Sequence, residues 1–204
     1  MVETQLAGRD IVDPRVLDAM AAVPRHEFVP TEAESEAYDD CPLPIGHGQT
    51  ISQPYIVALM LQLLEIPEAG RVLEIGTGCG YEAAVLARLA PEVCSVEIVA
   101  ELARGAETTL ARLGVHNVAV HVGDGRRGWP ERAPFDRIVA AAAGRAVPPA
   151  WLAQLAPGGR LVAPLGSRGE QWLHVFTKED GRLRDEPVIP VRFVALTGGE
   201  PRGR

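Results

Sequence analysis

From residue 70 onward, short runs rich in β-branched residues alternate with segments of helical periodicity. Two β-strands that run parallel in one sheet need a crossover connection, usually a helix, and this alternation supplies one between successive strands. The pattern therefore predicts an α/β fold with a doubly wound, mostly parallel sheet. The predicted strands are 71–75, 92–98, 117–124 and 135–143, and the predicted helices are 81–90 and 100–114. Segment 151–166 is predicted to form a short helix, a Pro-Gly-Gly turn and a further strand.

The C-terminal segment 171–196 departs from this rhythm. It contains two strand-like runs joined by the turn residues KEDG, with no room for a crossover helix. We expect the two runs to pair as an antiparallel hairpin at one edge of the sheet.

The first seventy residues have a different pattern. Segment 13–23 is a predicted helix with Asp13 at its N-cap, 24–30 is predicted to be irregular or extended, 31–40 is acidic and exposed, and 51–65 is a second helix. We interpret 1–70 as an N-terminal helical cap that packs on a core formed by 71–204, the whole being a single compact unit. A helical layer that merely completes the core fits the pattern equally well.

Composition and charge exclude several classes of protein. The 204 residues are 47% hydrophobic, which is enough for a full core, and the formal net charge of −7 argues against a general nucleic-acid binder. The chain begins MVETQLAGRD without a signal-peptide pattern, and no apolar run has membrane-spanning length. Three cysteines without CxxC spacing and five scattered histidines favour a reduced, cytoplasmic protein without a metal site.

A glycine-rich segment, VLEIGTGCGY at 72–81, combines the end of a predicted strand with the start of a helix. Gly76 and Gly78 allow a tight turn and close backbone approach, and the helix that follows offers free N–H groups to a ligand. The spacing is GxGxG rather than the dinucleotide pattern GxGxxG, and Glu74 precedes the turn inside the strand. Alone, this motif is also compatible with a tight strand-to-helix connection that binds nothing.

Two carboxylates strengthen the prediction of a ligand site. Glu97 ends the next strand, where a carboxylate can accept hydrogen bonds from both ribose hydroxyls, and Asp124 follows the third strand, where it could accept one from the amine of an adenine. Each residue alone is more often a polar strand end. Together with the glycines they predict a nucleoside pocket at the carboxyl ends of successive strands.

These features resemble the class I S-adenosylmethionine-dependent methyltransferases. With QTISQPY at 49–55, the chain is most similar to the protein-L-isoaspartate (D-aspartate) O-methyltransferase family. The similarity covers nearly the whole chain in the expected order: VLDAMAAVPRHEFVP, AYDDCPLPIGHGQTISQPYIVALM, VLEIGTGCGY, VGDGRRGWPERAPFDRIV, LAPGGRLVAPLG and VRFVALTG. It implies a Rossmann-like methyltransferase fold. Two departures are Cys79, where Ser is common, and Ala195, where Pro is usual.

The resemblance implies transfer of a methyl group from S-adenosyl-L-methionine to the free α-carboxylate of L-isoaspartyl residues in damaged proteins and peptides. The ester then closes to a succinimide, which initiates repair. The resemblance also implies a monomer, while the net charge and the lack of a membrane-length apolar run argue against a nucleic-acid or membrane partner. It assigns Ser52 as the catalytic residue; Gln49, Thr50, Ile51, Ser52, Gly76, Thr77, Gly78, Cys79, Glu97, Asp124, Gly125 and Thr197 to the cofactor; and Ile45, Gly46, His47, Gly48 and Ser52 to the substrate.

Methyl transfer to a carboxylate makes modest chemical demands on a site. The acceptor has an ordinary pKa of roughly 3 to 4, so it is already an anion and needs no strong base. Positioning, desolvation and a neutral hydrogen-bond donor are sufficient, and the Ser52 hydroxyl suits that task. Ser52 also fits the N-cap of helix 51–65, and we expect both roles. His47, between two glycines, indicates a flexible loop rather than a general base.

Other functions fit parts of the pattern. One is a carboxyl methyltransferase that modifies an aspartate side chain in a dedicated biosynthetic peptide. Another is a catalytically silent protein that binds the cofactor and serves as an interaction module. An NAD-dependent oxidoreductase is disfavoured by the GxGxG spacing and by the terminal hairpin.

Overall fold

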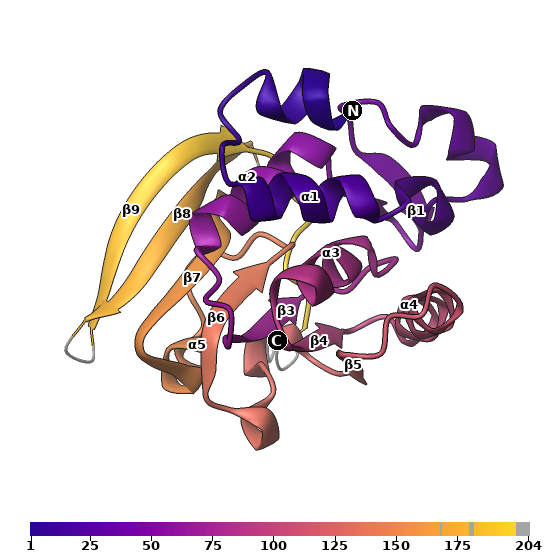
Figure 1. The fold of residues 1–204 in the computed structure, drawn as a ribbon. Helices are drawn as coiled ribbons and strands as arrows, with labels where there is room; N and C mark the ends of the chain where they lie inside the picture. Colours follow the sequence, from indigo (N-terminus) through magenta and orange to yellow (C-terminus); the bar gives the residue numbers. More distant parts are fainter. Residues whose placement is uncertain (168, 180–181, 199–204) are drawn as a thin grey trace.

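The computed structural model describes residues 1–167, 169–179 and 182–198. Within them the main sheet has seven strands in the order β5-β4-β3-β6-β7-β8-β9 (Figure 1). Neighbouring strands from β5 to β7 are parallel, and β8 pairs antiparallel with both β7 and β9. The strands are β3 (Arg71–Ile75), β4 (Glu92–Glu97), β5 (Val118–Val122), β6 (Phe135–Ala140), β7 (Leu155–Ser167), β8 (Glu170–Glu179) and β9 (Arg182–Val191).

This architecture confirms the predicted α/β fold with its mostly parallel sheet and its antiparallel C-terminal hairpin. Residues 180–181 of the predicted KEDG turn lie outside the described residues. The prediction of a separate Pro-Gly-Gly turn before the last parallel strand is wrong, because β7 already begins at Leu155. Leu155 pairs with Phe135 and Arg160 pairs with Arg137, so five steps along β7 match two along β6. The glycines therefore form an irregularity within the strand.

The helices agree with the predicted ranges to within a few residues. They are α1 (Pro14–Ala22), α2 (Pro54–Leu64), α3 (Tyr81–Leu89), α4 (Ala100–Arg112) and α5 (Pro149–Gln154). Short helical turns lie at Val2–Ala7, Arg25–Phe28, Thr31–Glu36, Gly125–Arg127 and Pro130–Arg132. The glycine-rich loop before α2 contains a small antiparallel hairpin of β1 (Leu43–Gly46) and β2 (Gln49–Ile51).

The N-caps of the first two long helices are formed differently. Asp13 caps α1 as predicted, since its Oδ1 accepts from the backbone N–H of Arg15 at 2.9 Å. The predicted cap of α2 by Ser52 is wrong, because the N-cap position is Gln53. Asp40 supplies the missing acceptor: its Oδ1 accepts from the backbone N–H of Tyr55 at 3.1 Å, and its Oδ2 accepts from Gln53 Nε2 at 2.8 Å. A carboxylate from the preceding segment therefore caps α2.

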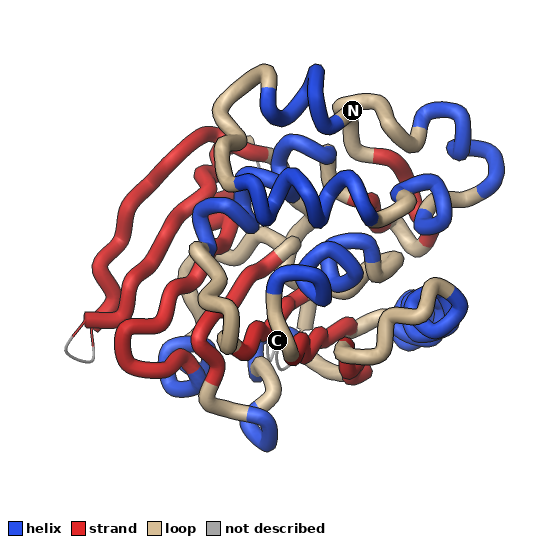
Figure 2. The backbone as a smooth tube through the Cα atoms, viewed as in Figure 1, coloured by secondary structure: helices blue, strands red, loops and turns tan. Residues whose placement is uncertain are grey.

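Apolar side chains pack on both faces of the sheet. One cluster joins α1, α2 and α3 to strand residues such as Val72 and Val139, and the other joins Trp151 of α5 to the alternate residues Leu73 and Ile138. Figures 1 and 2 show the N-terminal helices lying over α3 and the strands, while β8 and β9 extend as a long edge. The N-terminal seventy residues thus share one hydrophobic cluster with the sheet.

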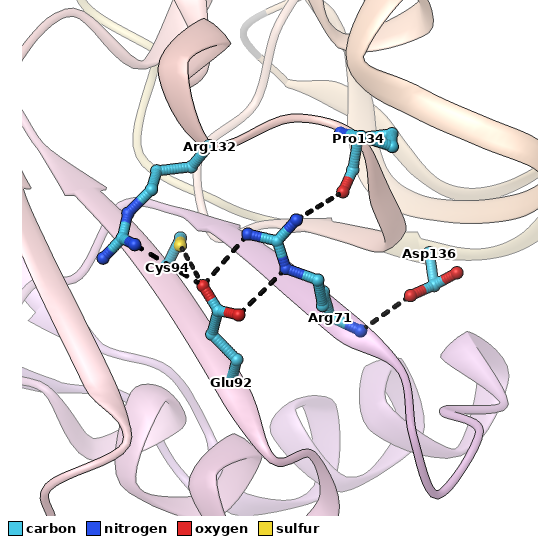
Figure 3. A network of polar contacts seen from close by, with 6 residues as sticks. All are labelled: Arg71, Glu92, Cys94, Arg132, Pro134 and Asp136. Atoms are coloured by element: carbon cyan, nitrogen blue, oxygen red, sulfur yellow. Dashed lines mark hydrogen bonds and ion pairs between the residues drawn. The ribbon is translucent and has the colours of Figure 1, made fainter.

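A polar network fixes the amino ends of the central strands (Figure 3). The guanidinium of Arg71, the first residue of β3, donates to both carboxylate oxygens of Glu92, the first residue of β4, at 2.9 and 3.0 Å. Asp136 in β6 accepts from the backbone N–H of Arg71 at 2.8 Å. The Arg71 interaction lowers the pKa of Glu92. This network aligns β3, β4 and β6 at the opposite end from the glycine turn.

Candidate active site

The strand order reverses between β3 and β6, and three cavities open at the carboxyl ends of these strands. Such a switch point is the usual place for a ligand in an open α/β sheet. We call the three spaces the strand-end cavity, lined by Glu97 and Thr197, the inner cavity, lined by Cys79 and Glu82, and the outer groove, lined by Ile56 and Phe193. Thr50 and Ala141 line all three, so the spaces are adjacent.

The strand-end cavity contains the buried carboxylate of Glu97. Its Oε2 accepts from the backbone N–H of Gly78 at 2.8 Å and its Oε1 accepts from that of Val99 at 2.9 Å. Gly125 and Thr197 also line this cavity. The carboxylate is therefore held rigidly at the end of β4, with lone pairs left for further donors.

Asp124 lies beside this cavity and does not line it. Its Oδ1 accepts from the backbone N–H of Arg126 at 2.9 Å, and a Cβ added at Gly198 would collide with its carboxylate. The C-terminal segment that contains Thr197 therefore passes directly over Asp124.

The glycine turn separates the strand-end cavity from the inner cavity. Gly76 and Gly78 have φ values of +96° and +55°, a region that L-residues rarely adopt. Thr77 is buried, and its hydroxyl lies 2.5 Å from that of Ser95. Cys79 lines the inner cavity, and burial raises the pKa of its thiol to about 11. The turn thus presents its backbone to both cavities and the neutral side chains of Thr77 and Cys79 to the inner cavity.

The β1–β2 hairpin places residues of the QTIS segment against this turn. A Cβ on Gly78 would lie 3.2 Å from Ile45 Cδ1, so the hairpin and the turn are in close contact. Gln49 and Thr50 line the strand-end cavity and Ile51 lines the inner cavity. Ser52 lines both the inner cavity and the outer groove, which places it where the two meet.

The tip of the hairpin is further from the cavities. Gly46, His47 and Gly48 all have positive φ values, between +52° and +86°, and all three are exposed. None of them lines the three cavities. Of the residues predicted to bind substrate, Ser52 alone therefore faces the described spaces, while Ile45 contacts the glycine turn.

Arg25 is a site residue that the sequence did not reveal. Its side chain is fully buried; Nε donates to the carbonyl of Ala37 and Nη2 to the carbonyl of Ser52, both at 2.8 Å. Its guanidinium lies 4.8 Å from the centroid of the Tyr81 ring. Burial lowers the pKa of Arg25. The residue fixes the backbone of Ser52 from 27 positions upstream, a contact that no local pattern signals.

Two buried carboxyl groups lie below the glycine turn. Glu74 of β3 is fully buried and accepts a hydrogen bond from the Ser95 hydroxyl. Glu82, in the first turn of α3, is 7% exposed and lines the inner cavity. Glu74 stands out in the sequence because it precedes the glycine turn, whereas Glu82 has the pattern of an ordinary first-turn glutamate.

The described residues contain no group of three or more His, Cys, Asp or Glu side chains suited to a metal ion. Within the same part of the chain, no helix has both the length and the apolar character needed to cross a bilayer.

Comparison with known proteins decides the family. The family model described as Protein-L-isoaspartate(D-aspartate) O-methyltransferase matches residues 1–201. The chain belongs to this family.

Curated relatives and solved structures agree with this assignment. A protein-L-isoaspartate O-methyltransferase of Opitutus terrae is 54% identical over 202 residues, covering 98% of this chain and 87% of the relative. One of Gloeobacter violaceus is 51% identical over 203 residues, covering 99% of each. A solved protein-L-isoaspartate O-methyltransferase superposes with a TM-score of 0.89 at 32% identity, covering 97% of this chain and 66% of that one.

A second solved structure is informative about ligands. It is described as a putative protein-L-isoaspartate O-methyltransferase from Plasmodium falciparum in complex with S-adenosyl-L-homocysteine. It superposes with a TM-score of 0.84 at 26% identity and covers 96% of both chains.

Family membership confirms the predicted reaction class and cofactor. This member of the protein-L-isoaspartate O-methyltransferase family is an S-adenosylmethionine-dependent protein carboxyl methyltransferase. The comparisons give no support to a dedicated biosynthetic acceptor or to a silent binding module.

Proposed function

We propose that the cofactor binds in the strand-end and inner cavities and that the isoaspartyl segment of the substrate binds in the outer groove. The reaction is methyl transfer to the free α-carboxylate of L-isoaspartyl residues in proteins and peptides. The observation that carries the proposal is the position of Ser52, which lines both the inner cavity and the outer groove.

The residues of the strand-end cavity fit the nucleoside part of the cofactor. Glu97 is fixed by two backbone donors and retains lone pairs for the ribose hydroxyls. Gly76 leaves room for close approach, and Thr197 and Gly125 complete the wall. Asp124, at the edge of this cavity beneath the segment that contains Thr197, is assigned to the adenine amine. When bound, the cofactor supplies a methyl group activated by a sulfonium.

The outer groove fits a peptide that carries an anionic acceptor. Its walls combine apolar residues such as Ile56 and Phe193 with Arg192, whose positive charge favours a carboxylate. Ser52 donates a hydrogen bond to the acceptor oxygen and stays neutral, so it orients the nucleophile without protonating it. Arg25 keeps Ser52 in place through its carbonyl.

The β1–β2 hairpin covers the acceptor in this proposal. Gln49, Thr50 and Ile51 reach the cofactor, while the exposed tip residues Gly46, His47 and Gly48, which line none of the cavities, are assigned to peptide backbone outside the groove. Residues 1–70 then act as the substrate-binding cap and the remainder as the cofactor-binding core. This division is supported by the origin of Thr50 and Ser52 in the first segment and of Gly76 and Glu97 in the second.

Hydrogen exchange with two peptide isomers tests the proposal. S-adenosyl-L-homocysteine is expected to protect amides at 76–79 and 97–99. Adding a peptide with one isoaspartyl residue is expected to extend protection to 43–53 and 190–194, whereas the isomer with normal aspartate leaves these segments unchanged. Equal protection by both isomers, or protection confined to other surfaces, would contradict the assignment of the groove.

We also propose that the enzyme works as a monomer in the cytoplasm. The three cavities are formed by residues of one chain, and Cys41, Cys79 and Cys94 are free thiols, as expected in a reducing compartment. Light scattering at micromolar concentration is expected to give the mass of one 21.8 kDa chain. A dimer mass would contradict the monomer.

A further inference from the structure

The inner cavity is lined by a carboxyl group that has no function in the mechanism above. Glu82 is 7% exposed, and its Oε1 has no hydrogen-bond partner among the described residues. The same holds for Oε1 of the fully buried Glu74. Burying a polar atom without a partner is unfavourable, and burying a charge is more so. A carboxyl with a free oxygen that lines a cavity is therefore suited to a ligand.

The groups around Glu82 favour its neutral form in the free protein. Glu74 from β3 is acidic, and Cys79 and Tyr81 are neutral because burial raises their pKa values to about 11 and about 12. Neither α2 nor β2 contributes an ionisable residue to the lining of the inner cavity.

Two arginines come from the remaining elements that pack on α3. Arg25 is bonded to the carbonyls of Ala37 and Ser52, and Arg15 of α1 donates to the carbonyl of Leu89 at the far end of α3. Neither has a hydrogen bond or ion pair with Glu82. Burial raises the pKa of Glu82 to about 8, and burial together with the charge of Glu82 raises the pKa of Glu74 well above its usual range.

The inner cavity is a direct continuation of the strand-end cavity. Thr50, Gly76 and Gly78 line both spaces. With the nucleoside near Glu97, the amino-acid end of the cofactor extends past the glycine turn toward Glu82. That end carries an α-ammonium, whose natural partner in a buried site is a carboxylate.

We propose that Glu82 releases its proton to solvent when the cofactor binds, and that the resulting carboxylate pairs with the cofactor's α-ammonium. The inference rests on the proposed location of the cofactor. It makes Glu82 a cofactor-binding residue and links cofactor affinity to pH. At pH 7 a group that titrates near 8 is about 90% protonated, so binding is expected to release about 0.9 proton. Between pH 6 and 7.5 the Kd is expected to fall about tenfold per pH unit.

Calorimetry with S-adenosyl-L-homocysteine tests this coupling. This ligand carries the same α-ammonium but no transferable methyl group, so turnover does not contribute to the heat. Titrations at pH 7.0 in phosphate and in Tris, buffers with very different ionisation enthalpies, give the number of protons released. The wild type is expected to release about 0.9 proton and Glu82→Gln close to none. Glu107→Gln, on the exposed face of α4, is the matched control and is expected to behave as the wild type.

The outcomes separate the inference from the proposed function. Binding with equal heats in the two buffers, or equal proton release by the wild type and Glu82→Gln, would overturn the role of Glu82 and leave the proposed function intact. Absence of binding by the wild type would contradict the cofactor site itself. If Glu82→Gln does not fold, the Kd of the wild type for S-adenosyl-L-homocysteine is measured from pH 6 to 7.5. A Kd that does not change over this range overturns the inference.

Discussion

At the scale of single residues, Ser52 and Asp40 have separate roles. The sequence predicts an N-cap at Ser52, because this serine lies two residues before Pro54, and the family resemblance implies its catalytic role. In the structure Asp40 caps α2, and Ser52 lines the inner cavity and the outer groove. Stability and catalysis can therefore be perturbed independently at these two positions.

Replacing Ser52 is expected to affect turnover far more than folding. Ser52→Ala removes a neutral donor to an anionic acceptor, an interaction of about 1.5–3 kcal/mol, so kcat/KM for an isoaspartyl peptide is expected to fall by about 10- to 100-fold. The melting temperature is expected to change little, because no cap is lost. Ser35→Ala, on the exposed segment 31–36, is the control. An unchanged kcat/KM in the folded variant would remove Ser52 from the reaction.

Replacing Asp40 is expected to have the opposite profile. Asp40→Ala removes the acceptor for the Tyr55 N–H and the ion pair with Arg9, so the free energy of unfolding is expected to fall by about 0.5–2 kcal/mol. Urea denaturation measures the change, and Asp39→Ala at the exposed neighbour is expected to stay within about 0.5 kcal/mol of the wild type. Equal stability of the two variants would argue against the cap.

Local patterns in the sequence do not reveal the roles of Arg25, Asp40 and Glu82. Arg25 and Asp40 act on groups 27 and 15 positions away, and Glu82 is distinguished by burial alone. The glycine turn and Glu97 could be predicted because their spacing follows from the strand-turn-helix unit itself. Contacts between distant segments depend on how the segments pack, which local periodicity does not encode.

At the scale of elements, the helices and parallel strands were predictable and the β1–β2 hairpin was not. The periodicity of the helices and parallel strands arises because their apolar side chains pack in the two clusters on either face of the sheet. The hairpin has short strands with little apolar alternation, and its turn residues all have positive φ values. Its position depends on contact with the glycine turn and on Arg25, which fixes the residue that follows β2.

The C-terminal segment is expected to tolerate no side chain at Gly198. Its φ of +102° disfavours L-residues, and a Cβ there would collide with the Asp124 carboxylate. Gly198→Ala is therefore expected to displace the segment that carries Thr197 and to weaken S-adenosyl-L-homocysteine binding by about tenfold, measured by calorimetry.

Gly105 provides a matched glycine in an ordinary helix. A Cβ at this exposed position of α4 meets nothing within 4 Å. Gly105→Ala is expected to raise the free energy of unfolding by about 0.5–1 kcal/mol and to leave ligand binding unchanged. Equal ligand affinity in the Gly198 and Gly105 variants would contradict the closure of the site by the C-terminal segment.

At the scale of the whole molecule, the order of the strands creates the site. The alternation of strands and helices predicts a parallel sheet but does not determine which strands are neighbours. The observed order places β6 beside β3, so the glycine turn and Ala141 face the same cavities. The Arg71 network aligns these strands from the opposite end (Figure 3).

The free protein is expected to lose stability as the pH rises from 5 to 8. Burial raises the pKa of Glu82 to about 8 in the folded state, while the unfolded value is about 4.3. A carboxyl group whose pKa is higher in the folded than in the unfolded protein stabilises the folded state. This contribution is complete at pH values below the unfolded-state pKa and is lost as the pH rises to the folded-state pKa. Glu82→Gln lacks this contribution. Between pH 5 and 8 the free energy of unfolding of the wild type is therefore expected to fall by on the order of 3 kcal/mol more than that of the variant. If the urea midpoints of the wild type and of Glu82→Gln change equally with pH, a buried neutral Glu82 is contradicted.

Selectivity for isoaspartyl carboxylates is tested most directly by transfer of labelled methyl from S-adenosyl-L-methionine to a mixture of two synthetic peptides. The peptides differ only in carrying an isoaspartyl or a normal aspartyl residue. Separation of the isomers and release of label by base measure esterification of each. We expect base-labile label in the isoaspartyl peptide alone. Equal labelling of both isomers, or labelling of neither by protein that binds the cofactor, would contradict an enzyme that selects isoaspartyl carboxylates.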